Sequence, residues 1–179
     1  MHTPSFLALL VVATLLLPAP ARAAHPNELK PRLRTTDAQM QELLTFGLEM
    51  SPSMRALVAS LNASDVVVYL RCARLPPRID GQLTFVSSGG GLRYVVVRIA
   101  WDRSQMRRLS ILGHELQHAL EIAARPDIVD QESLALAYAG FGFKRESLGH
   151  RSAAFDTDAA IHAGDRVWRE VNGTVSADD

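Results

Sequence analysis

The sequence predicts an α+β fold, in which helices stand before and after a short run of strands. Apolar residues recur at helical spacing in two stretches between residues 37 and 61. Three runs between residues 65 and 101 are short and rich in β-branched residues, which is typical of strands. Helical spacing then returns after residue 104. This order favours a small α+β domain with a three-stranded, mainly antiparallel sheet between N-terminal and C-terminal helices.

Length and composition fit one globular domain. The chain has 179 residues, of which 47% are hydrophobic, so it can build a packed core. Its 19 basic residues balance its 19 acidic residues, which argues against a nucleic-acid-binding protein with a broad basic surface.

The N-terminus has the pattern of a secretory signal peptide. The apolar run from Phe6 to Leu17 is short for a membrane span, and Ala21-Arg22-Ala23 follows it as a small-x-small cleavage site. We expect residues 1–23 to be removed and residues 24–179 to form a single exported domain, periplasmic or secreted, without a stable membrane anchor. A retained anchor is the alternative. Cys72 is the only cysteine, so no internal disulfide can form.

The N-terminal elements follow from cap and breaker residues. Residues 24–34 contain two prolines and are expected to form an extended lead-in. Thr36-Asp37 can cap a helix that runs to about Met50, and Ser51-Pro52 can start a second helix.

The strands are expected over residues 65–72, 83–86 and 93–101. Pro76-Pro77 separates the first strand from the second, and a turn rich in Ser and Gly over residues 87–91 separates the second from the third. Strands two and three should therefore form a hairpin, and the third leads directly into the next helix.

Three helices complete the prediction. The first covers about 104–124 and ends at Arg125-Pro126. The second covers about 132–138, capped by Asp130 and closed by Gly140 and Gly142. Residues 143–153 are expected to form a loop, and the last helix runs from about 155 to 171, where Asn172-Gly173 stops it.

The motif that carries chemistry is His114-Glu115-Leu116-Gln117-His118, an HExxH sequence. Residues four apart lie on one face of a helix, so both imidazoles can reach one zinc ion. Glu115 projects to the side, where it can act as general base toward a water that the metal activates. The predicted helix has a leucine-rich core side opposite His114 and His118, as expected for a helix buried in a small domain.

A catalytic zinc ion needs a third protein ligand and an open position. Asp156 is the first choice, because it is expected on a small, apolar face of the last helix, where an acid is costly without a partner. A helix cap is the alternative role for Asp156. The other candidate ligands are Glu121, His150, Asp158 and His162.

The two segments HELQH and DTDAA together resemble the HExxH…ExxA pattern of gluzincin-type zinc peptidases, a group of the zincins. Asp156 and Ala159 match the acid and the alanine of the second motif, with Asp in place of the family's Glu. The resemblance covers about residues 93–171 and implies a zincin-like domain. It also implies that the strand before the active-site helix, here residues 93–100, is a sheet edge that pairs with an extended peptide.

These observations predict an exported zinc metallopeptidase that acts on a peptide or protein, with His114, His118 and Asp156 on Zn²⁺ and Glu115 as catalytic base. One alternative is a zincin-like domain that binds zinc without catalysis and serves in binding or structure. Another is a small secreted interaction domain without metal. In secondary roles, Glu121 could orient a ligand, and His150 or Tyr138 could stabilise an oxyanion.

Overall fold

The computed structural model describes residues 31–145 and 154–175. The predicted signal peptide, residues 1–23, and the candidate ligand His150 lie outside these ranges. Within them, no helix is both long and apolar enough to cross a membrane.

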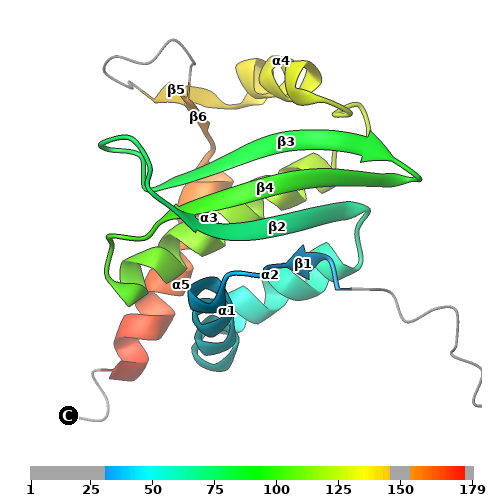
Figure 1. Ribbon diagram of the computed structural model, residues 1–179. Coiled ribbons are helices and arrows are strands. Elements are labelled where there is room, and N and C mark those ends of the chain that lie inside the picture. Colours follow the sequence, from blue (N-terminus) through cyan, green and yellow to red (C-terminus); the bar gives the residue numbers. More distant parts are fainter. Residues whose placement is uncertain (1–30, 146–153, 176–179) are drawn as a thin grey trace, which may run out of the picture. The chain divides into compact units, whose positions relative to one another are not determined.

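The described residues form an α+β fold, as predicted, in which two helices precede and three helices follow the three longest strands in sequence (Figure 1). The helices are α1 (Ala38–Met50), α2 (Pro52–Asn62), α3 (Gln105–Ala123), α4 (Gln131–Phe141) and α5 (Asp158–Val175). The strands are β1 (Leu33–Arg34), β2 (Val66–Ala73), β3 (Gly81–Gly89), β4 (Leu92–Ala100), β5 (Phe143–Arg145) and β6 (Ala154–Asp156).

The sheet differs from the prediction in strand number and direction. It has four strands in the order β1-β2-β4-β3, and only the β3–β4 hairpin is antiparallel. β2 runs parallel to both β1 and β4, in register from Val66↔Arg93 to Ala73↔Ala100. The expected edge position of residues 93–100 is wrong, because β4 lies between β2 and β3. The edge strand on that side of the sheet is β3.

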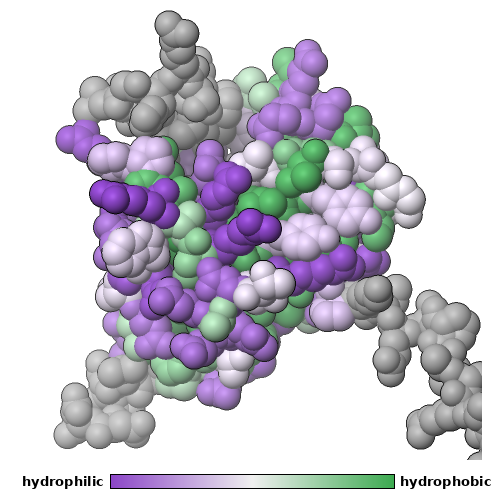
Figure 2. Space-filling model, viewed as in Figure 1, coloured by the Kyte–Doolittle hydropathy of each residue, from purple (hydrophilic) through white to green (hydrophobic). Residues whose placement is uncertain are grey.

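One face of the sheet carries the core. Its side chains pack against α3, and α1, α2 and α5 surround α3 behind the sheet (Figure 1). The buried residues on this face alternate along each strand: Val66, Val68, Leu70, Val95, Val97 and Ile99. The opposite face, toward the viewer in Figure 2, shows hydrophobic patches among hydrophilic side chains.

Small residues allow α3 and α5 to cross closely. A Cβ added at Gly113 would lie 2.7 Å from Val167 Cγ2, and one added at Gly164 would lie 3.0 Å from the carbonyl oxygen of Ser110. Ala160 and Ala163 are fully buried on the same side of α5. This packing holds the start of α5 beside the middle of α3.

The C-terminal elements begin and end at other residues than predicted. α4 continues through Gly140 to Phe141, and α5 starts at Asp158 and continues past Asn172-Gly173 to Val175. β5 occupies the first three residues of the expected loop, residues 143–153, and β6 follows that loop. Asp156 therefore belongs to a strand and not to a helix. Asp130 caps α4 as expected, in a capping box with Ser133.

Candidate metal centre

The HExxH segment lies in the middle of the buried helix α3. Ser104 caps this helix by accepting from the N–H of Arg107, and the helix is regular from Gln105 to Ala123. His114 and His118 therefore stand one turn apart on the same face. His118 is 6% exposed, so its imidazole is withdrawn from solvent.

Asp156 reaches the two histidines from the end of β6. β6 pairs with β5, and Phe143 stands opposite Asp156. Thr157 follows and caps α5, since its Oγ1 accepts from the N–H of Ala160. Asp156 is 1% exposed and is held where the chain turns from strand to helix.

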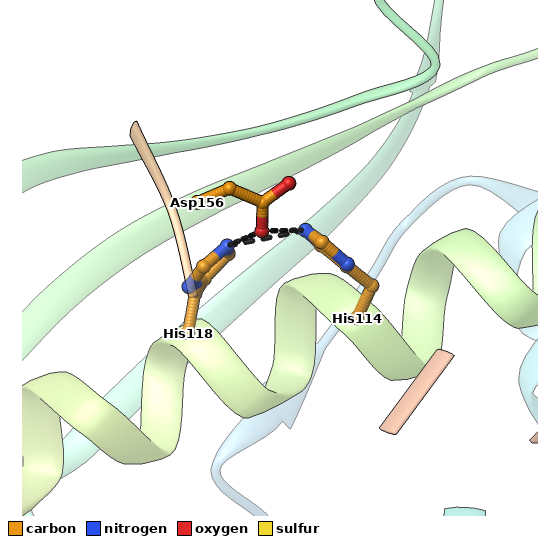
Figure 3. Close-up of side chains that lie close together, drawn as sticks. All are labelled: His114, His118 and Asp156. Carbon is orange, nitrogen blue, oxygen red and sulfur yellow. Dashed lines mark hydrogen bonds and ion pairs between the residues drawn. The ribbon is translucent and has the colours of Figure 1, made fainter. Parts of the chain in front are cut away.

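The imidazoles and the carboxylate converge on one point (Figure 3). His114 Nε2 lies 3.2 Å from His118 Nε2 and 3.3 Å from Asp156 Oδ1, and the distance from His118 Nε2 to Asp156 Oδ1 is 3.7 Å. Zinc bonds of about 2.0–2.1 Å at tetrahedral angles place ligand atoms about 3.3 Å apart. Two histidines and one carboxylate at these distances fit the donor set of a zinc ion.

Glu121 fixes the orientation of His118. Its Oε2 lies 2.8 Å from His118 Nδ1 and accepts from the Tyr138 hydroxyl at 2.7 Å, while its Oε1 accepts from Thr157 Oγ1 at 2.6 Å. When Nδ1 carries the proton toward Glu121, the lone pair of Nε2 faces His114 and Asp156. Glu121 thus contacts His118 in the way expected of a residue that orients a metal ligand, the secondary role that the sequence analysis gave it.

Burial and the hydrogen bonds among these groups shift their pKa values in opposing directions. Burial alone raises the pKa of Glu121, but hydrogen bonds from His118, Thr157 and Tyr138 outweigh it and lower the pKa overall. Burial alone lowers the pKa of His118, yet the hydrogen bond to Glu121 and the nearby carboxylates raise it overall. Burial and the charge of Glu121 raise the pKa of Tyr138, so its hydroxyl remains a donor.

Glu115 is not one of the three converging residues. It is 6% exposed, and its carboxylate packs against the backbone of Gly81 at the start of β3. A Cβ at Gly81 would lie 2.4 Å from Glu115 Oε1 and 2.5 Å from Ile111 Cγ2, so only glycine leaves room for this carboxylate. Glu115 therefore stands between the HExxH helix and the edge strand.

The remaining candidates take other positions. Asp158 and His162 are exposed on α5. The hydroxyl of Tyr138 is bonded to Glu121 and lies 3.0 Å from His118 Nδ1, on the far side of that ring from Nε2. This position does not suit the oxyanion role considered for Tyr138.

Sequence reasoning missed Thr157, which links Glu121 to the cap of α5. The sequence does contain a signal for this role, because Thr immediately before an apolar helical run is a favourable N-cap residue. Comparisons with protein-family models, with curated proteins and with solved structures found no match to this chain.

Proposed function

We propose that this chain is a zinc-dependent peptidase. The observation that carries the proposal is the convergence of His114, His118 and Asp156, whose ligand atoms all lie within 4.8 Å of one another. The HExxH sequence on a regular helix and the resemblance to gluzincin-type peptidases support the same assignment.

Each residue has a separate role in this proposal. His114, His118 and Asp156 hold the metal, and Glu121 keeps His118 in the tautomer that presents Nε2. Zinc bound there would supply a Lewis acid and lower the pKa of water toward about 7. Glu115 accepts a proton from the attacking water and passes it to the leaving amine, as a general base and then a general acid.

The substrate in this proposal is an extended peptide. β3 is the sheet edge beside Glu115, and an edge strand offers main-chain N–H and C=O groups to a peptide. β3 thus takes the place that the sequence prediction gave to residues 93–100. The apolar N-terminal run and the small-x-small pattern that follows it support an exported protein.

Elemental analysis and activity together test the proposal. We expect about one zinc ion per purified chain, lost in His118→Ala. We expect Glu115→Gln to keep the zinc and to lose at least about a hundredfold in the cleavage of library peptides. Zinc with no Glu115-dependent cleavage would leave a zinc-binding domain without catalysis. A chain without zinc, even when zinc is supplied, would overturn the metal site.

A further inference from the structure

The pairing of β3 with β4 determines which groups of β3 face the open edge. Ala100 N–H donates to the Asp80 carbonyl at 2.8 Å, so Asp80 and Ala100 form a hydrogen-bonded pair just before β3 begins. In an antiparallel pair such pairs alternate along the strands. Gln82 and Thr84 therefore turn their N–H and C=O groups toward β4, whereas Gly81, Leu83 and Phe85 turn theirs outward.

The outward-facing backbone groups of β3 differ in their hydrogen-bond partners. The N–H of Phe85 donates to Gln131 Oε1 at 3.0 Å, and further along the strand Ser88 Oγ donates to the Val129 carbonyl at 2.9 Å. The chain entering α4 thus lies against the C-terminal half of the β3 edge. Among the described residues, none is hydrogen-bonded to the outward groups of Gly81 and Leu83.

Gln131 takes the place of a neighbouring strand at Phe85. A paired peptide would lie about 4.8 Å from β3 and would offer its own carbonyl to each outward N–H. The side-chain carbonyl of Gln131 already occupies that position at Phe85. A peptide that pairs with Gly81 and Leu83, beside Glu115, therefore meets this side chain at the next outward position.

We propose that Gln131 is a specificity-determining residue that ends peptide pairing along β3, so that the site takes an extended stretch of about three residues on that side. This inference rests on the proposed peptidase function. It implies that the enzyme favours short peptides or chain ends over the interior of long extended segments.

A length series of peptides tests the inference. Starting from a peptide that wild type cleaves and Glu115→Gln does not, residues are added one at a time on each side of the scissile bond, with both ends blocked. For wild type we expect kcat/KM to rise with length on one side and to level off early on the other. In Gln131→Ala, kcat/KM for the longer peptides should rise about two- to tenfold on the side where the wild-type value levels off. This is the range expected for one hydrogen bond.

Two variants provide controls. Gln131→Glu keeps an acceptor for the Phe85 N–H and should retain the wild-type length dependence. Glu132→Ala changes the exposed neighbour in the first turn of α4 and should do the same. Thermal unfolding of each variant establishes that it is folded.

The outcomes separate the two proposals. A rise of wild-type kcat/KM with length on both sides, or the same length dependence in Gln131→Ala and Gln131→Glu, would overturn the role of Gln131 and leave the peptidase intact. If no peptide is cleaved in a Glu115-dependent way, both proposals fall together.

Discussion

Three carboxylates around His118 receive different roles from their surroundings. Asp156 approaches the Nε2 side, Glu121 binds Nδ1, and Glu115 packs against Gly81 beside the sheet edge. Hydrogen bonds from three neighbours keep Glu121 ionised, which suits a group that orients an imidazole. The position of each carboxylate, more than whether it belongs to Asp or Glu, determines its role at the candidate site.

Glu121→Gln tests the orienting role. The amide has no charge to hold the proton on His118 Nδ1, and its NH₂ group cannot accept from Tyr138 or Thr157. We expect zinc affinity to fall about 10- to 100-fold, as for other partners of metal-bound histidines. Competition with a chelator measures this, and Glu132→Gln, at an exposed glutamate on α4, serves as the control. Equal affinity in both variants would contradict the role.

Gly81→Ala tests the placement of Glu115. The added methyl group would meet Glu115 Oε1 and Ile111 Cγ2 well inside contact distance, and the carboxylate must move. We expect peptide cleavage to fall at least about tenfold while zinc binding stays near wild type, with a stability cost of about 1–3 kcal/mol. Gly89→Ala is the control, because nothing lies within 4 Å of a Cβ at that end of β3.

Residue identity at the candidate site was more predictable than its geometry. The HExxH spacing led to His114 and His118, and an acid expected on a small, apolar face of the last helix led to Asp156; the structure brings the three together. Asp156 was assigned to a helix face, whereas Thr157 caps α5 and leaves Asp156 in β6. One capping side chain determines where a helix starts. When the cap is placed at the wrong residue, residues before the true start, such as Asp156, are wrongly assigned to a face of the helix.

At the scale of elements, local signals predicted the helices and the β3–β4 hairpin, but not the parallel pairings of β2. Caps at Asp37, Ser51 and Ser104 mark α1, α2 and α3 correctly, and the positive φ angles of Gly90 and Gly91 suit the tight β3–β4 turn. The parallel pairing of β2 with β4 joins strands separated by β3, and no local pattern encodes it. β1 has only two residues, too few to show an alternation.

The close crossing of α3 and α5 should control the metal site. At Gly164→Ala the new Cβ would lie 3.0 Å from the Ser110 carbonyl oxygen and 3.3 Å from His114 Cβ, so α5 must shift away from α3. Because Asp156 lies just before α5, we expect zinc affinity to drop about tenfold or more. Ala also favours the helix by about 1 kcal/mol, so the net change in stability should be small.

Gly173→Ala provides the matched control for that variant. It lies on the same helix, gains the same propensity, and has nothing within 4 Å of an added Cβ. Chelator competition on both variants distinguishes displacement of α5 from a general effect of alanine. Equal zinc affinity in the two would show that the crossing distance does not govern the site.

Arg93 joins the start of β4 to the C-terminal end of α3. It pairs with Asp65 through two contacts of 2.7 Å and donates to the carbonyls of Ile122 and Arg125. The hydrogen bond from Arg93 holds the pKa of Asp65 below its ordinary value. A depressed pKa stabilises the fold above about pH 4, and this stability is lost as the pH falls through the folded-state pKa.

Asp65→Asn should remove that pH dependence. We expect a loss of about 1–2 kcal/mol at neutral pH, less than for a fully buried pair because the Asp65 side chain is 41% exposed. The free energy of unfolding, measured by urea titration from pH 7 to pH 2, should decline less steeply below pH 4 in the variant. Parallel curves for wild type and variant would contradict this account.

For the whole molecule, the candidate site joins regions that the sequence keeps apart. His114 and His118 come from α3, whereas Asp156 precedes α5, and no disulfide can secure the fold because Cys72 stands alone. A ligand that binds only the folded chain stabilises it by mass action. Zinc should therefore act on global stability as well as on chemistry.

Thermal unfolding of metal-free protein during zinc titration measures this coupling. At a hundredfold excess of free zinc over its Kd we expect about 2.7 kcal/mol of added stability, which raises Tm by roughly 5–10 °C in a chain of this size. His118→Ala should show no such rise, because one of the three donors is gone. His162→Ala removes an exposed histidine of α5 and should keep the full rise. If His162→Ala abolished the shift and His118→Ala preserved it, zinc would bind at the surface of α5 and not between α3 and β6.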